Sequence, residues 1–331
     1  MRRRRAFAQA WGVYQDELLP LTELDFSLPL PRTMPFTTAM ARDCGVAPHR
    51  LSEMCKAGAL RRPLRGVYVD ASLPDSLELR AACLRLVMPA DGVVVDRHAG
   101  WLLGAQMVLA PHESMEARPL SVFRPSGRGR VGHSVASGGE RALTDADVTE
   151  VAELRVTTPI RTAWDLGRVR WTDEAIAGLD AMFRLGAFSR DEFLGGIDRF
   201  RGHRWVTTLR AVGPLADGRS ESPGESVLRL RCHENGLQMT PQVEVQRGDG
   251  RLARLDLANE ELRAAVEYDG VEWHSTPSQV QHDRSRRADL ADTGWDIAVF
   301  GKELVFGRAR ECDRVLRELW HRATRRAQRV A

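Results

Sequence analysis

Three carboxylates, Asp256, Glu267 and Asp269, stand in stretches that otherwise have the pattern of half-buried strands. Apolar and charged residues alternate over 253–257, which predicts a strand with Asp256 on the face opposite its leucines. After a polar turn at 258–261 the alternation resumes over 262–269 and places Glu267 and Asp269 on one face. Such carboxylates repel one another unless a cation lies between them, and hard dications take oxygen ligands. The pattern predicts a site for Mg²⁺, with Mn²⁺ as a substitute; the alternative is a solvated acidic sheet face.

The same stretch resembles a known family. Asp256, the sequence Glu267-Tyr268-Asp269-Gly270 and His274 are similar to the very-short-patch-repair-like endonucleases of the PD-(D/E)XK superfamily. The resemblance covers the last third of the chain, from Ser220 onward. It implies a metal-dependent endonuclease that cleaves DNA phosphodiesters, in defence or repair. In that family an Asp and a Glu on paired strands bind Mg²⁺, which activates the attacking water, and an upstream helical Glu assists.

Transferred to this chain, the resemblance makes Asp256 and Glu267 the metal ligands. Glu225 and Asp269 would complete or orient the site, and His274 or His282 would relay protons. The superfamily's Lys, two residues after the Glu, is Asp269 here, although this family shows the Glu-x-Asp-Gly form. The competing hypothesis is a DNA-binding regulator of antitoxin type that keeps the nuclease fold without activity. The missing Lys favours that hypothesis, and the retained Asp and Glu oppose it.

Glu225 has two alternative roles. Ser222-Pro223-Gly224-Glu225 is typical of a capping box that opens a helix ending near Gly236, so Glu225 would bond back to the Ser222 backbone. In the resembled family the matching Glu faces the metal. The elements expected after this helix are a strand at 242–245, the two acidic strands, a helix at 279–293, a strand at 295–300 and a helix at 308–326. This αβββαβα order contains the αβββαβ core that the resemblance implies.

The expected hairpin raises a geometric difficulty. With a turn at 258–261, Glu267 would lie opposite residue 252 or 253, on the order of 10 Å along the strand from Asp256. One ion could not bridge that span. The site therefore requires a bulge, a bend or a longer effective turn that brings Glu267 back toward Asp256.

Residues 37–70 predict two short helices followed by a hairpin. Thr37 or Thr38 would cap a helix that Gly45 ends, and Pro48 would open a second helix that Gly58 ends. This is a winged-helix pattern, and it resembles the N-terminal winged helix of AbiEi-type antitoxins. In a DNA-binding module the second helix would enter the major groove while the wing contacts phosphates; the alternative is a winged helix used for protein contacts. The expected DNA contacts are Arg50, Lys56, Arg61, Arg62 and Arg65.

Basic residues also flank the acidic strands. The helix expected at 279–293 carries Arg284 and Arg286, which we expect to contact DNA, and the last helix has an arginine-rich side. Arginine matches phosphate through paired hydrogen bonds, so carboxylates edged by arginine suit a phosphodiester better than a sugar or a peptide. The alternative for the last helix is a solvated face that aids solubility.

With 331 residues, 43% of them hydrophobic and 28% charged, the chain is expected to be a multidomain α+β protein. We expect an N-terminal arm and winged helix over 1–74, an α+β connector over 75–215, in which Arg161 is a structural ion-pair partner, and a nuclease-like domain over 220–331. Short apolar runs and the lack of an apolar leader predict a cytoplasmic protein without membrane contact. The five scattered cysteines indicate neither disulfides nor zinc. DNA is the expected partner, and a homodimer or an operon partner stays open.

Overall fold

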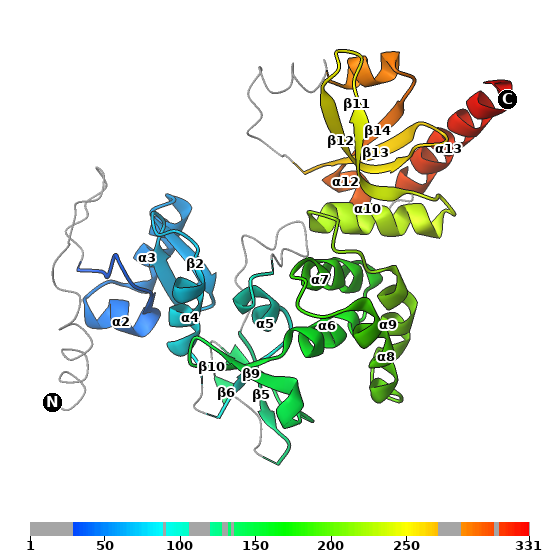
Figure 1. The fold of residues 1–331 in the computed structure, drawn as a ribbon. Helices are drawn as coiled ribbons and strands as arrows, with labels where there is room; N and C mark the ends of the chain where they lie inside the picture. Colours follow the sequence, from blue (N-terminus) through cyan, green and yellow to red (C-terminus); the bar gives the residue numbers. More distant parts are fainter. Residues whose placement is uncertain are drawn as a thin grey trace. The chain divides into compact units, whose positions relative to one another are not determined.

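The computed structural model describes residues 29–88, 91–105, 120–127, 132–133, 136–270, 286–307 and 311–330. They belong to two compact units. The first lies within Met1–Ala90, Ala117–Leu120 and Val131–Ser137, and the second within Asp91–Glu116, Ser121–Arg130 and Gly138–Ala331. The chain is a mixed α/β protein with several sheets (Figure 1). None of the described helices has the length and apolarity needed to span a bilayer.

The first unit contains the predicted helix, turn, helix and hairpin. The oxygen Oγ1 of Thr37 accepts the N–H of Met40 at 3.2 Å and caps the first helix, while Gly45 and Gly58 end the two helices with φ of 82° and 74°. Three strands form a sheet in the order β1-β3-β2. The elements are β1 (Phe36–Thr37), α2 (Thr38–Asp43), α3 (Pro48–Lys56), β2 (Leu60–Leu64), β3 (Val67–Asp70) and α4 (Leu77–Arg85), with a β6 (Gly132–His133) and β7 (Ala136–Ser137) hairpin.

The core of the first unit orients α3. Leu51 and Met54 of α3 pack with Phe36, Leu60 and Tyr68, and the rings of Phe36 and Tyr68 stack 5.9 Å apart. Leu51 and Met54 therefore form the buried face of α3. The opposite face of the helix stays exposed to solvent.

The second unit begins with a sheet and a set of helices. β10 pairs with β4 in parallel and with β9 antiparallel, and β4 pairs with β5. The elements are β4 (Val93–Val94), α5 (Asp96–Leu102), β5 (Leu120–Pro125), β8 (Glu140–Arg141), β9 (Val148–Val151), β10 (Leu154–Thr157), α6 (Pro159–Gly167), α7 (Thr172–Arg184), α8 (Arg190–Gly195) and α9 (Val206–Val212).

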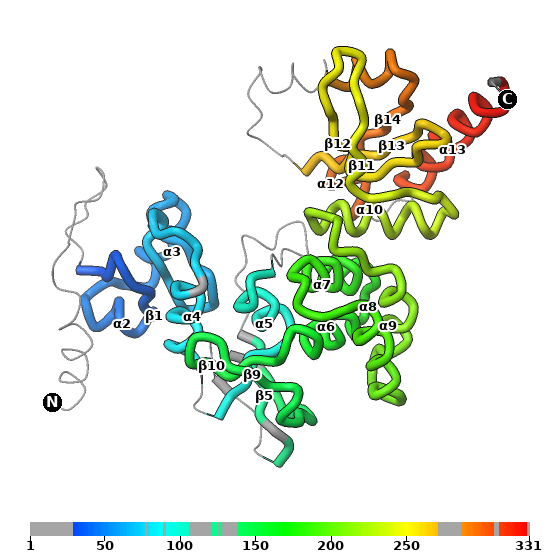
Figure 2. The backbone as a smooth tube through the Cα atoms, in the orientation of Figure 1, coloured from blue at the N-terminus to red at the C-terminus, as the bar shows by residue number. Residues whose placement is uncertain are grey.

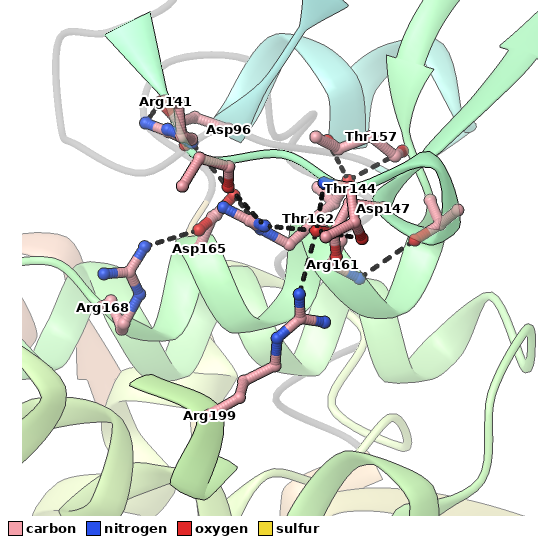
Figure 3. A network of polar contacts seen from close by, with 12 residues as sticks. Asp96, Arg141, Thr144, Asp147, Thr157, Arg161, Thr162, Asp165, Arg168 and Arg199 are labelled. Carbon is pink, nitrogen blue, oxygen red and sulfur yellow. Dashed lines mark hydrogen bonds and ion pairs between the residues drawn. The ribbon is translucent and has the colours of Figure 1, made fainter. Parts of the chain in front are cut away.

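A buried ion-pair network joins α6 to α5, to β8 and to the short 3-10 helix at Asp145–Asp147 (Figure 3). Arg161, whose side chain is 3% exposed, lies 2.9 Å from both Asp147 and Asp165. Arg141 bridges Asp165 and Asp96. Burial alone would raise the pKa of Asp165, but the charges of Arg141 and Arg161 lower it overall. The predicted structural role of Arg161 is confirmed.

The last part of the chain folds in the predicted αβββαβα order, with one short helix added. Its strands form a sheet in the order β11-β12-β13-β14, in which only β13 and β14 are parallel among the described pairs (Figure 2). The elements are α10 (Pro223–Glu234), β11 (Thr240–Gln246), β12 (Leu252–Asn259), β13 (Ala264–Asp269), a helical segment at 286–292, β14 (Asp296–Gly301), the unpredicted α12 (Lys302–Phe306) and α13 (Glu311–Val330).

Apolar side chains cover both faces of this sheet. The pair Leu257 and Val266 packs in a core that includes Leu228 of α10 and Leu316 of α13. The next pair, Ala258 and Ala265, packs in another core with Leu290 and Trp295. The core at α10 continues without a break into α6, α7 and α9, and the side chains of Arg229 on α10 and Asp180 on α7 are 2.6 Å apart. The division at 215–220 stays a prediction.

Candidate functional site

The hairpin between β12 and β13 turns two residues later than predicted. Asn259 pairs with Ala264, so the turn occupies 260–263, and the side-chain oxygen of Asn259 accepts the N–H of Leu262 at 2.8 Å. This local hydrogen bond favours a turn after Asn259, a preference that the strand alternation does not reveal. Because Leu257 pairs with Val266, Asp256 comes opposite Glu267 one step farther along. The predicted turn position was wrong, and the later turn removes the separation of about 10 Å that a turn at 258–261 would impose, as the predicted site required.

The strand alternation of β12 breaks at Asp256. Leu255 packs in the core with Leu290, whereas Leu257 packs in the core with α10. Gln242 lies opposite Asp256 on β11, between two regular strand pairs, and has a φ of 55°. A residue other than glycine in this left-handed region is strained, and such residues are frequent at functional sites. The irregularity therefore marks the position where the acidic side chains gather.

Glu225 reaches this position from the first turn of α10. Gly224 allows the close approach, since a Cβ atom there would lie 2.1 Å from the ring of Tyr268. The Glu225 side chain is nearly buried, and its Oε2 accepts the N–H of Glu221 and the Nε2–H of Gln242, each at 2.8 Å. The expected bond to the Ser222 backbone is thus replaced by one to the preceding residue. Glu225 caps the helix start and also lies beside the acidic strands.

The carboxylate of Asp256 lies close to two others. Burial raises its pKa most, the charges of Glu225 and Glu267 add to the rise, and the Tyr268 N–H and Arg286 oppose it, which leaves the pKa of Asp256 at about 6. Glu225, Asp256 and Glu267 therefore form one group, which we call the acidic cluster. Such a perturbed carboxyl group is typical of functional sites, although ion-pair networks also produce it.

Two arginines neutralise Glu267. Its carboxylate, 5% exposed, receives both Nη atoms of Arg286 at 2.8 and 2.9 Å, and the Nε of Arg287 at 3.1 Å. Arg286, expected to contact DNA, here holds a buried carboxylate. Among the described residues no three His, Cys, Asp or Glu side chains are spaced to hold a metal ion. Asp269 is exposed at the end of β13, and His274, His282 and Arg284 lie outside the described residues.

Two residues of this site were missed by the sequence analysis. Arg287 was not distinguished from its basic neighbours. Gln242 donates to Glu225, and its Oε1 is buried without a hydrogen-bond partner among the described residues. Gln242, Glu244 and Gln246 alternate with valines along β11, so the sequence holds no signal that separates Gln242 from solvent-facing strand residues.

The basic residues of the first unit differ in their contacts. Lys56, Arg62 and Arg65 are exposed and make no ion pair among the described residues. Arg50 pairs with Glu53 at 2.9 Å in solvent, which is a weak interaction. Arg61 instead donates to the main-chain carbonyl of Leu73, so its guanidinium serves the fold.

The wing lies beside α3. Burial raises the pKa of the Cys55 thiol, and the nearby charge of Arg62 opposes that rise. Arg62 on β2 is therefore close to the end of α3, where Lys56 is the next residue. Exposed cations therefore lie on two neighbouring elements, and we call Lys56 and Arg62 the basic edge.

Comparison with known proteins agrees with this geometry. Residues 32–69 match the family model described as transcriptional regulator, AbiEi antitoxin. Two uncharacterized proteins of Mycobacterium tuberculosis, MT2308 and Rv2248, are each 31% identical to the chain over 251 residues, which is 75% of this chain and 88% of theirs. The chain belongs to the family of these mycobacterial proteins. In this family member the regulator match covers α2, α3, β2 and all but the last residue of β3.

Proposed function

We propose that the protein is a DNA-binding regulator of antitoxin type, which contacts duplex DNA through residues 32–69. The observation that carries this proposal is the basic edge formed by Lys56 of α3 and Arg62 of the wing. Both cations are exposed and lack carboxylate partners among the described residues, so a phosphate would be their first strong partner in this unit. The match of the same residues to a transcriptional regulator supports the choice of DNA.

The contacts expected from this surface are mainly electrostatic. In a winged helix, α3 would enter the major groove while Arg62 and Arg65 contact the backbone. Each phosphate contact releases counterions, so the logarithm of the affinity falls linearly with the logarithm of the salt concentration. The side chain of Arg61 is excluded from this set because it donates to Leu73.

The test is DNA binding by the full chain at several salt concentrations. Arg62→Gln/Arg65→Gln should flatten the salt slope by about 1.8, since each phosphate contact contributes about 0.9. The matched control is Arg170→Gln/Arg204→Gln, which removes the same charge from exposed arginines of the second unit. A wild-type protein that binds no duplex, or a wing variant with an unchanged slope, would refute the proposal.

A second candidate function is metal-dependent cleavage of DNA at the acidic cluster. The specific observation in its favour is the raised pKa of Asp256, since a cation beside Glu225 and Glu267 would relieve their repulsion. The donor chemistry suits a hard dication, because Asp256, Glu225, Glu267 and the Oε1 of Gln242 all offer oxygen, but the three carboxylates as placed are not spaced to hold one, so binding would require them to move together. These residues would hold Mg²⁺ or Mn²⁺, which when bound lowers the pKa of water and neutralises phosphate.

In this candidate function the arginines have a second role. Arg286 and Arg287 would exchange Glu267 for the phosphate of the substrate, which arginine forks match well. The discriminating experiment is incubation of supercoiled plasmid with the pure protein in Mg²⁺, in Mn²⁺ and in EDTA, with Asp256→Asn as the control. Nicking that needs the metal and Asp256 would support an endonuclease. An intact plasmid with retained DNA binding would leave the regulator.

A further inference from the structure

Helix α13 carries an unpaired row of cations. Arg317, His321, Arg325 and Arg329 follow one another at intervals of four residues, and all four are exposed. None of them makes an ion pair or a hydrogen bond within the part of the chain that the structure describes. We call these four residues the α13 stripe.

The other arginines of α13 have partners, which shows that the stripe is a distinct set. Arg314 pairs with Glu311 and Glu318, and Arg322 lies 2.9 Å from Asp296. Arg326 donates to the main-chain carbonyls of Leu262 and Arg263. No acidic residue occurs after Glu318 in this helix, so the stripe has no acidic neighbour along its last three turns.

The orientation of the helix directs the stripe to solvent. Leu316, Leu319 and Ala323 are fully buried in the core of the second unit. At 100° per residue, the stripe begins on the side of the helix opposite these buried residues and shifts gradually around the helix axis. A membrane-surface helix needs a free apolar face, and the apolar face of α13 is already used.

We propose that the α13 stripe is a second surface for the phosphate backbone of duplex DNA, separate from the basic edge of the first unit. Successive stripe residues are about 6 Å apart along the helix axis, and the whole stripe is about 18 Å long. That length spans about five phosphates of one strand. All charged stripe residues except the histidine are arginines, which bind phosphate through paired hydrogen bonds.

The choice of DNA as the partner rests on the proposed function. Regular cations on a rigid helix suit a regular polyanion better than the irregular charge of an acidic protein surface. The stripe would add affinity without sequence preference, because phosphate contacts position a protein but carry no base information.

The experiment measures binding of the full chain to a fluorescent duplex of random sequence between 50 and 200 mM KCl. Arg317→Gln/Arg325→Gln should reduce the salt slope by about 1.8, so that the wild type loses about tenfold more affinity than the variant over this range. Arg170→Gln/Arg204→Gln is the control for net charge. Thermal melting checks that both variants stay folded.

The outcomes separate this inference from the proposed function. If Arg62→Gln/Arg65→Gln weakens DNA binding while the stripe variant binds like the wild type, the stripe alone is overturned. A flattened slope in the stripe variant with no effect of the wing variant would support the stripe and refute the assignment of DNA contacts to residues 32–69. Equal effects of the stripe and control variants would also overturn the stripe, as would a wild type that binds no DNA. A parallel titration uses vesicles containing phosphatidylserine, and an effect of the stripe variant on vesicle binding alone would likewise overturn the stripe.

Discussion

The main-chain N–H of Tyr268 donates to Oδ2 of Asp256 at 2.8 Å, so a backbone group holds a carboxylate whose ionisation is opposed by burial and by two neighbouring carboxylates. An ionised Asp256 must then lie beside Glu225 and Glu267, which costs stability. An asparagine at this position keeps an oxygen for the Tyr268 N–H and removes the charge.

We therefore expect Asp256→Asn to stabilise the protein at neutral pH. The folded pKa of Asp256, about 6, is above its ordinary value of 3.8. The free energy of unfolding of the wild type should therefore fall relative to that of the variant as the pH rises from about 4 to about 6. The rise in pKa corresponds to at most about 3 kcal/mol, and partial exposure reduces the expected difference to about 1–2 kcal/mol above pH 6. Urea unfolding at pH 4 to 8 measures it. Glu244→Gln, an exposed change on β11, serves as the control, and equal pH profiles for Asp256→Asn and wild type would contradict the expectation.

Removal of Arg286 should be strongly destabilising. Glu267 is nearly buried and both its oxygens receive Arg286, so Arg286→Ala leaves an uncompensated charge and should cost about 3 kcal/mol. Arg287→Ala should cost less, because Arg287 is more exposed and makes one contact at 3.1 Å. Adding Glu267→Gln to Arg286→Ala should recover part of the loss in urea unfolding. No recovery would mean that Arg286 stabilises the fold by packing alone.

A similar argument applies to Arg161 in the network of Figure 3. Arg161→Met keeps much of the side-chain volume but leaves Asp147 and Asp165 with fewer cations in a buried place, so the expected cost is about 3 kcal/mol. Arg201→Met, which removes an exposed pair with Asp198, should change the free energy of unfolding by less than about 0.5 kcal/mol. Equal effects of the two changes would show that the network adds no stability.

Arg61 and Arg62 are neighbours in the sequence but should respond oppositely to substitution. Arg61→Ala removes the hydrogen bond to the Leu73 carbonyl, which should lower the free energy of unfolding by about 1 kcal/mol and with it the melting temperature. The same change should have little effect on DNA affinity. Arg62→Ala should weaken DNA binding and leave melting unchanged. Both variants need only a melting curve and a titration with duplex at low salt, and the reverse pattern would contradict the assignment.

The elements with strong local signals were predictable from the sequence. Thr37, Gly45, Pro48 and Gly58 mark the helix ends of the first unit, and the structure places the ends there. Strand alternation likewise identified the pair that carries Asp256 and Glu267. The register could not be predicted, because it depends on the hydrogen bond that the Leu262 N–H donates to the Asn259 side chain, which competes with the strand pattern.

The composition of the acidic cluster was less predictable than its location. Gln242 contacts Glu225 of the cluster at a point where its strand bends with a φ of 55°, and Arg287 contacts Glu267 because a helical turn brings it there beside Arg286. Both contacts join residues of different secondary-structure elements, so residue spacing along the sequence does not predict them. The partnering of Arg61 was missed for the same reason, since Leu73 lies beyond the hairpin.

Helix α10 packs into one core with α6 and α7 on one side and β12 and β13 on the other. This shared packing bears on how the protein could be inherited or dissected. A fragment beginning at Ser220 would lose the part of this core that α6, α7 and α9 contribute, together with the Asp180 partner of Arg229. A gene rearrangement that transferred only the acidic strands would therefore leave α10 without half of its packing. A piece that evolution, or an expression experiment, could exchange would have to include α6 and α7 as well as the acidic strands.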